Sequence, residues 1–184
     1  MDKTLNIIKT DIKGLFIIEP ITVKDERGSF SRIFCLNELN KIFNENIKQI
    51  NHSSTNKKGT VRGLHYQYEP FSEVKIVKCI KGSIFDIVVD MRQNSKTFLK
   101  TFSIKLTQEN QKMLYIPKGF AHGFQTLENN TELFYLHSNI YTPSNEGALN
   151  AKDPSLDIKW PLNITNISKK DTEHKYLDEK FKGL

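Results

Sequence analysis

We predict an all-β protein, a double-stranded jelly-roll β-sandwich with a few short helices. Short runs of β-branched, aromatic and other apolar residues follow one another along most of the 184 residues. Turn signals that contain glycine or proline separate many of these runs, and helical signals are few. Many short strands at close spacing indicate a sandwich or a barrel, and a double-sheet jelly roll is a natural solution.

Ten runs are expected to form strands. The run that begins at Ser83 mixes β-branched and aromatic residues, which favours a strand over a helix. Turns are expected at 57–59, 81–82 and 117–119, where a glycine ends each signal. In chain order the ten runs are 14–18, 30–34, 48–52, 61–67, 74–80, 83–89, 102–106, 113–116, 122–127 and 131–138.

Two short helices are also expected. Asn37 is suited to cap a helix that continues through Leu39, Ile42 and Phe43, and a second helix is expected over 176–181. The sequence contains no repeat, low-complexity tract or linker rich in proline, glycine and serine. We therefore expect residues 1–184 to form a single domain.

Composition bounds the partners and the location. The net charge is +6, but the lysines are scattered and mixed with acids, which indicates a solvated surface rather than a nucleic-acid-binding stripe. The sequence contains no run of about 18 apolar residues, so it predicts no membrane span, and the first residues do not resemble a signal peptide. Cys35 and Cys79 are expected as thiols in a reducing compartment. We expect a cytoplasmic protein without nucleic-acid or membrane partners, whose positive field suits a diphosphate-bearing small molecule.

Three clusters carry side chains suited to chemistry. In the first, at 62–67, alternation along a strand places Gly63, His65 and Gln67 on one face. Arg62 points to the other face unless the strand bends at Gly63. The other clusters are 116–124, which includes His122, and 134–143, which includes Tyr135 and Tyr141. Taken singly, each of these histidines and tyrosines also fits a structural, hydrogen-bonded role.

Metal binding is the first alternative, because many jelly-roll proteins hold a metal ion with histidines. The five histidines here are isolated, with no HxH or HExxH pattern, so we expect no metal and no other cofactor, although a site built from distant strands stays open. Nucleophilic catalysis has little support, since there is no GxSxG elbow and neither cysteine has an activating neighbour. The histidines are His52, His65, His122, His137 and His174.

Beyond these local patterns, the order of motifs resembles the dTDP-4-dehydrorhamnose 3,5-epimerase family. The resemblance extends from about Gly14 to Asp171. The motifs are Asp25-Glu26-Arg27-Gly28, Arg62-Gly63-Leu64-His65-Tyr66-Gln67, Lys75-Ile76-Val77, the segment 116–124, Tyr135, Tyr141-Thr142-Pro143 with Glu146, Ile158-Lys159-Trp160-Pro161 and Ser168-Lys169-Lys170-Asp171.

The resemblance implies a cupin-type jelly roll that works as a homodimer and inverts C3, C5 or both in a nucleoside-diphosphate 4-keto-6-deoxy sugar. It implies that His65 is the general base, paired with Asp171, that Tyr135 is the general acid on the opposite face, and that Lys75 stabilises the enolate oxygen. The residues expected to bind the nucleotide, the diphosphate or the sugar are Arg27, Arg32, Gln49, Asn51, Arg62, His122, Tyr141, Glu146 and Lys170.

These residue types suit the implied reaction. A hydrogen beside a ketone is acidic because its removal spreads charge onto the carbonyl oxygen, and inversion needs a base on one face and a proton donor on the other. Histidine titrates near neutral pH and tyrosine is a weak acid. A carboxylate fixes the tautomer of the histidine, and an ammonium group stabilises the charge that appears after proton removal.

Two departures from the family pattern leave the substrate open. Arg32 stands where thymidine-linked enzymes usually have Glu. Glu accepts hydrogen bonds and Arg only donates them, so the nucleotide base bound here would need an acceptor where thymine offers a donor. Ala151 stands where the family usually has Trp. The alternatives are a single-centre epimerase of a CDP- or GDP-linked dideoxy or heptose sugar, a non-catalytic cupin that binds a sugar nucleotide, and a metal-dependent cupin enzyme.

Overall fold

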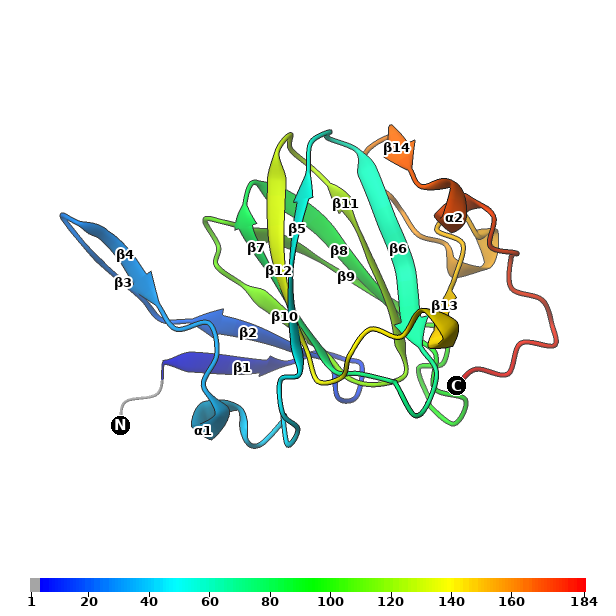
Figure 1. The fold of residues 1–184 in the computed structure, drawn as a ribbon, viewed down its shortest axis with the longest axis horizontal. Coiled ribbons are helices and arrows are strands. Elements are labelled where there is room, and N and C mark those ends of the chain that lie inside the picture. Colours follow the sequence, from blue (N-terminus) through cyan, green and yellow to red (C-terminus); the bar gives the residue numbers. More distant parts are fainter. Residues whose placement is uncertain (1–3) are drawn as a thin grey trace.

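Two β-sheets pack face to face in the computed structural model, which describes residues 4–184 (Figure 1). Within those residues the first sheet has antiparallel strands in the order β1 (Leu5–Lys9), β2 (Phe16–Pro20), β10 (Met113–Ile116), β7 (Lys75–Lys81), β12 (Thr131–His137) and β5 (Gln49–Thr55). The second has the order β13 (Glu146–Ala148), β6 (Thr60–Gln67), β11 (Phe120–Thr126), β8 (Ser83–Asp90) and β9 (Thr101–Thr107), with β14 (Asn166–Ile167) parallel to β6. This is the predicted all-β, cupin-like jelly roll.

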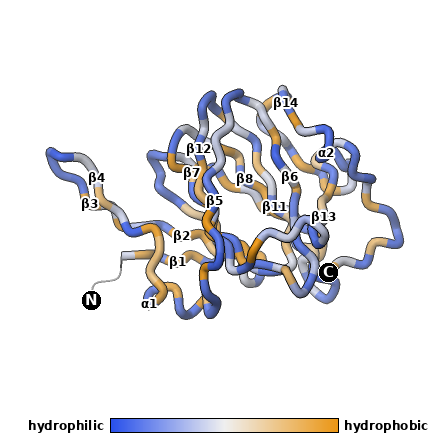
Figure 2. The backbone as a smooth tube through the Cα atoms, in the orientation of Figure 1, coloured by the Kyte–Doolittle hydropathy of each residue, from blue (hydrophilic) through white to orange (hydrophobic). Residues whose placement is uncertain are grey.

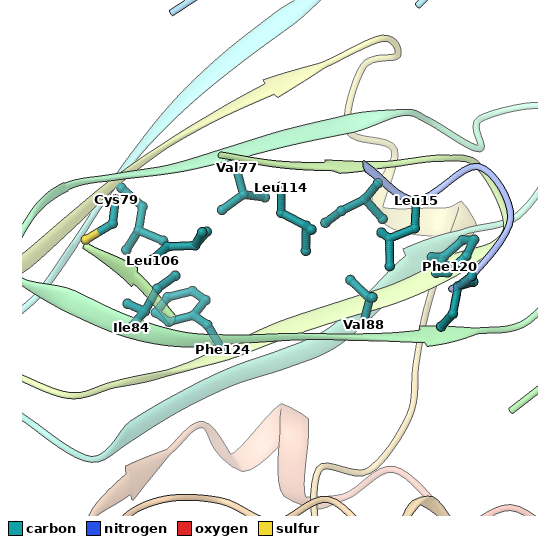
Figure 3. Packing of buried hydrophobic residues seen from close by; sticks show 12 residues of the cluster. Leu15, Val77, Cys79, Ile84, Val88, Leu106, Leu114, Phe120 and Phe124 are labelled. Atoms are coloured by element: carbon teal, nitrogen blue, oxygen red, sulfur yellow. The ribbon is translucent and has the colours of Figure 1, made fainter. Parts of the chain in front are cut away.

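A core of apolar side chains lies between the two sheets. Val77 and Leu114 of the first sheet face Ile84 and Val88 of the second, as Figure 3 shows, and all four are fully buried. Strand β8 is buried along nearly its whole length, which explains why its sequence is rich in β-branched residues rather than alternating with polar ones. At one end of this core Leu15 and Phe120 pack against the same cluster.

A separate hairpin, β3 (Thr22–Asp25) with β4 (Gly28–Ser31), extends away from the sandwich (Figure 1). Its tip is hydrophilic, whereas apolar residues gather near the short helix α1 (Leu36–Leu39) and strands β1 and β2 (Figure 2). Those apolar residues form a second core on the outer face of the first sheet, which includes Leu39 and Phe43. The hairpin itself has no comparable cover within residues 4–184.

The ten predicted runs all overlap strands, but β1, β3, β13 and β14 were not predicted. The run 30–34 is the least accurate, because β4 ends at Ser31 and Arg32 turns its guanidinium toward Glu38, 2.8 Å away. Helix α1 begins after Cys35, so the prediction that Asn37 caps it is wrong.

The segment 176–181 contains no helix, contrary to the prediction. The carboxylate of Asp153 accepts the backbone N–H of Leu177 at 2.6 Å, and Phe181 stacks on Phe98, so contacts with distant residues hold this segment in place. The remaining short elements are η1 (Pro143–Asn145), η2 (Pro154–Leu156) and α2 (Lys169–Thr172). Across residues 4–184, no helix is both long and apolar enough to cross a bilayer.

Candidate active site

A cavity of about 730 Å³ lies between the two sheets, on the side where β5, β7 and β12 face β6 and β11. Helix α2 and the start of β13 complete its wall. All the predicted site residues except Arg27 and Arg32 line this cavity. They are His65, Tyr135, Asp171, Lys75, Gln49, Asn51, Arg62, His122, Tyr141, Glu146 and Lys170.

Strand β6 carries one more residue than its partner β11 at the cavity. His65 pairs with His122 and Arg62 with Phe124, so three steps along β6 match two along β11. The irregularity includes Gly63, whose φ of +106° is a conformation that other residues rarely adopt. It brings both Arg62 and His65 to the cavity, as expected if the strand bends at Gly63.

His65 and Asp171 form a hydrogen-bonded pair, with Nε2 of the imidazole 2.7 Å from Oδ1 of the carboxylate. Ser168 caps α2 by accepting the N–H of Asp171 at 3.0 Å, so Asp171 is not itself the cap. Burial raises the pKa of Asp171, but the His65 interaction and the N–H of Gly63 outweigh this and leave that pKa below its usual range. An ionised carboxylate therefore orients the imidazole and leaves Nδ1 as the nitrogen available for proton transfer.

Tyr135 belongs to the opposite wall of the cavity. It lies on β12, between Val77 of β7 and Asn51 of β5, whereas His65 belongs to the other sheet. Burial and the nearby charge of Asp86 raise the pKa of Tyr135. The phenol therefore stays protonated at neutral pH and has a proton to donate.

A second histidine–carboxylate pair lies on the same sheet as His65 and contacts Tyr135 across the cavity. Nε2 of His122 lies 2.7 Å from Oδ1 of Asp86, and both side chains are buried. The ring of His122 meets the ring of Tyr135 edge-on, with the centroids 6.2 Å apart. Burial raises the pKa of Asp86, against the lowering effect of His122, and among residues 4–184 its Oδ2 atom has no hydrogen-bond partner. The pair fixes the ring against which Tyr135 packs.

Lys75 is held by a buried carboxylate. Its Nζ lies 3.0 Å from Oε1 of Glu73 and 3.4 Å from the backbone oxygen of His65. Gln67 donates a hydrogen bond to the other carboxylate oxygen of Glu73. An ammonium group that a carboxylate holds in place, with little access to solvent, is suited to stabilise a developing negative charge.

The outer part of the cavity carries a chain of polar contacts. The hydroxyl of Tyr141 donates to Oε2 of Glu146 at 3.1 Å, and Lys170 forms an ion pair with the same carboxylate. Burial raises the pKa of Glu146, but Lys170 and His65 outweigh it, so that this pKa lies below its usual range. Arg62 donates to Thr55 at 3.1 Å and leaves part of its guanidinium exposed.

Arg27 and Arg32 lie outside this cavity. Arg27 is on the turn of the β3–β4 hairpin, is 85% exposed and pairs with Asp25. Arg32 donates to Glu38 at 2.8 Å and to Thr4 at 3.2 Å. Their assignment to substrate binding stays a prediction.

Sequence reasoning did not assign several residues that line the cavity. Glu73 and Gln67 hold Lys75, and His137 lies beside Tyr135 with 6.1 Å between the ring centroids. The alternation of β12 gave a signal for His137, because residues two apart on a strand share a face. Glu73 precedes its strand and gave no comparable signal.

Over residues 4–184, no three His, Cys, Asp or Glu side chains are grouped so that they could hold a metal ion. The histidine–carboxylate pairs of the cavity are instead closed two-residue units, each joined by one hydrogen bond. What the geometry offers is a paired imidazole, a protonated phenol and an ammonium group around one space, an arrangement suited to proton transfer.

Comparison with known proteins agrees with this geometry. The family model for dTDP-4-dehydrorhamnose 3,5-epimerase matches residues 9–179. A dTDP-4-dehydrorhamnose 3,5-epimerase of Shigella flexneri is 39% identical over 184 residues, covering 96% of this chain and 99% of that protein.

Solved structures give the same result. The Bacillus anthracis dTDP-4-dehydrorhamnose 3,5-epimerase, with TDP and pyrophosphate bound, has a TM-score of 0.91 at 32% identity and covers 94% of this chain and 99% of its own. A Legionella pneumophila epimerase in complex with dTDP-4-keto-L-rhamnose has a TM-score of 0.89 at 38% identity, with coverage of 94% and 92%. The chain therefore belongs to the dTDP-4-dehydrorhamnose 3,5-epimerase family and is an isomerase.

Proposed function

We propose that this epimerase acts on a dTDP-linked 4-keto-6-deoxy sugar and inverts C3, C5 or both by proton transfer through an enolate. The observation that carries the proposal is the position of the His65–Asp171 pair on one sheet and of Tyr135 on the other, with one cavity between them. The ligands of two related structures, TDP with pyrophosphate in one and dTDP-4-keto-L-rhamnose in the other, support the substrate class.

The first step is removal of a proton from the carbon beside the ketone. The lone pair on Nδ1 of His65 takes this proton, and the electrons of the broken C–H bond move into a new C=C bond while the carbonyl oxygen becomes an enolate. Asp171, at 2.7 Å, stabilises the imidazolium that forms. Lys75 stabilises the enolate oxygen, and Glu73 keeps its ammonium group in place.

The second step returns a proton to the opposite face of the same carbon. The phenol of Tyr135 donates it, the enolate collapses to the ketone, and the configuration is inverted. The resulting phenolate and imidazolium return to their starting states by proton exchange with solvent. Burial of Tyr135 keeps the proton on the phenol until the basic enolate is present.

The charged side chains toward the outside of the cavity suit the nucleoside diphosphate. Arg62 and Lys170 supply positive charge, and Gln49 and Asn51 supply amide groups. We assign these four residues, with His122, Tyr141 and Glu146, to binding of the substrate.

A homodimer is part of the proposal. On the β3–β4 hairpin, Phe30 is 73% exposed and Val23 is 62% exposed. A two-stranded hairpin is only marginally stable by itself in water, and exposed apolar side chains that lie together indicate a surface that another protein covers. Arg27 and Arg32 lie on or beside this hairpin and away from the cavity of their own chain. Sedimentation of the protein and of Phe30→Ser tests this assignment: a dimer that dissociates in the variant supports it, and a wild-type monomer contradicts it.

We also propose a cytoplasmic location, which suits the free thiols of Cys35 and Cys79.

Deuterium exchange tests the function directly. The dTDP-, CDP- and GDP-linked 4-keto-6-deoxy sugars are incubated with the enzyme in D₂O, and loss of the C3 and C5 proton signals is followed by NMR. Exchange with the dTDP sugar that His65→Asn abolishes and that persists after treatment with a chelator is the expected result. Absence of exchange with all three nucleotides would contradict the proposal and favour a binding protein.

A further inference from the structure

His137 is the last residue of β12 and lines the cavity, where it is a neighbour of both Lys75 and Tyr135. In the sheet it pairs with Lys75 on one side and with Gln49 on the other. Its ring lies next to that of Tyr135, two residues earlier on the same face, with 6.1 Å between the centroids. The mechanism above gives this imidazole no role.

A chain of hydrogen bonds fixes which ring nitrogen of His137 carries a proton. The backbone N–H of Tyr141 donates to Oε1 of Gln49 at 2.9 Å, so the amide nitrogen of Gln49 points the other way. That nitrogen donates to Oδ1 of Asn51 at 3.1 Å. Nδ2 of Asn51 is therefore the atom that faces Nε2 of His137, at 3.4 Å. An amide nitrogen only donates, so Nε2 of His137 accepts and the proton lies on Nδ1.

The imidazole is uncharged at neutral pH. Burial and the nearby positive charge of Lys75, with His122, lower the pKa of His137 to about 3. The tautomer is thus neutral, with Nδ1–H as its donor. Among residues 4–184 this nitrogen has no hydrogen-bond partner and is not one of the fully buried atoms, so it keeps some exposure, and the ring to which it belongs lines the cavity.

The position of this donor selects one part of the sugar. Lys75 takes the C4 oxygen in the proposed function, on which this inference rests, and His137 is the direct neighbour of Lys75 across the strands. The carbons next to C4 carry a hydroxyl at C3 and a methyl at C5. A neutral N–H suits the hydroxyl and not the methyl, because an unpaired donor against an apolar group loses its hydrogen bond to water.

We propose that His137 recognises the C3 hydroxyl of the sugar as a hydrogen-bond donor, and that it makes the enzyme prefer sugars with this hydroxyl over 3-deoxy sugars. The preference arises because the donor is left unpaired when the hydroxyl is missing. Gln49 and Asn51 act on the preference through the tautomer of His137.

A cycle of two enzymes and two substrates tests the proposal. The substrates are dTDP-4-keto-6-deoxyglucose and dTDP-4-keto-3,6-dideoxyglucose, which both have an exchangeable proton at C5. The kcat/KM of C5 exchange in D₂O is measured for the wild type, His137→Phe and His137→Ala. We expect each variant to lose about ten-fold on the 3-hydroxy sugar and no more than about two-fold on the 3-deoxy sugar. The ratio of the two kcat/KM values, measured with the same enzyme preparation, does not depend on the fraction of enzyme that is folded.

Phe134→Leu is the matched control, because Phe134 lies on the same strand and is not part of the cavity wall. It should leave the substrate ratio at the wild-type value. Equal losses on both substrates in the His137 variants would overturn the proposal while leaving the proposed function intact. No exchange by the wild type with either sugar would overturn both.

A measurement without turnover checks the tautomer. The ¹⁵N NMR spectrum of the ligand-free enzyme at pH 7 should show His137 protonated at Nδ1, and Asn51→Leu should remove the preference for that tautomer. An Nε2-protonated ring or an imidazolium in the wild type would contradict the inference.

Discussion

Oδ1 of Asp171 lies 2.7 Å from Nε2 of His65, although 106 positions separate the two residues in the chain. The link is made by β14, which runs parallel to β6 and delivers the start of α2 beside the middle of that strand. Ser168 then caps α2 and directs Asp171 toward β6, where Gly63 also donates to its carboxylate at 3.4 Å. The pair is therefore a product of tertiary structure and not of local sequence.

Replacement of Asp171 by Asn should lower kcat/KM by about 100-fold or more. The amide offers no negative charge to the imidazolium and can hold His65 in the wrong tautomer. Initial rates of C5 exchange provide the measurement. The control is Glu173→Gln, which removes an exposed carboxylate two residues later, in a surface pair with Lys169. A similar loss in both variants would contradict a specific role for Asp171.

Replacement of Tyr135 by Phe should separate exchange from inversion. The base on the other wall still removes a proton and solvent deuterium returns to the same face, so exchange continues while the inverted product is lost. NMR of the product mixture distinguishes deuterated starting sugar from epimer. Because the pKa of Tyr135 is raised, the wild-type rate should show no loss from phenol ionisation up to about pH 10, the reference value for tyrosine. Inversion at the wild-type rate in the variant would remove Tyr135 from the mechanism.

Replacement of Gly63 by Ala should impair both stability and activity. An added Cβ would lie 2.6 Å from the backbone oxygen of His122, and the φ of +106° disfavours any other residue. We expect a loss of about 1–3 kcal/mol in the free energy of unfolding by urea. Gly28→Ala is a matched control, because its φ is +129° but a Cβ there meets no atom within 4 Å. Equal losses for the two variants would show that the contact with β11 is unimportant.

Much of the sandwich was predictable from local sequence. The apolar, β-branched run of β8 and the Pro-Lys-Gly turn before β11 have signals that do not depend on distant contacts. Short elements such as β13 and β14 gave no signal, because their pairing with β6 exists only after the fold has formed. The helix expected over 176–181 is absent for the same reason, since contacts to Asp153 and Phe98 override local propensity. The assignment of residues 1–184 to one domain stays a prediction.

The candidate site was accessible to sequence reasoning mainly through the family resemblance. A period of two assigns His65 to a face, but it cannot tell where a strand carries an extra residue, and the bend at Gly63 decides the side of Arg62. Glu73 was missed because its contact with Lys75 depends on the loop that joins β6 to β7. Arg27 lies on the hairpin, outside the cavity of its own chain, so its assignment to substrate binding stays a prediction.

Stability should depend on pH through His137 between about pH 3 and pH 6.5. These limits are the pKa of His137 in the folded protein, about 3, and its reference pKa, 6.5. The pKa is lowered in the fold, so in this range the unfolded chain binds more protons than the native protein, and stability falls as the pH falls. One group with this shift contributes a slope of up to about 1.4 kcal/mol per pH unit, with the full stability present above pH 6.5. Urea unfolding of the wild type and His137→Phe at pH 7, 5.5 and 4 measures this slope. The gap between their free energies of unfolding should change in favour of the variant as the pH falls, because Phe has no proton to bind. Two curves that stay parallel over this range would show that His137 does not resist protonation in the fold.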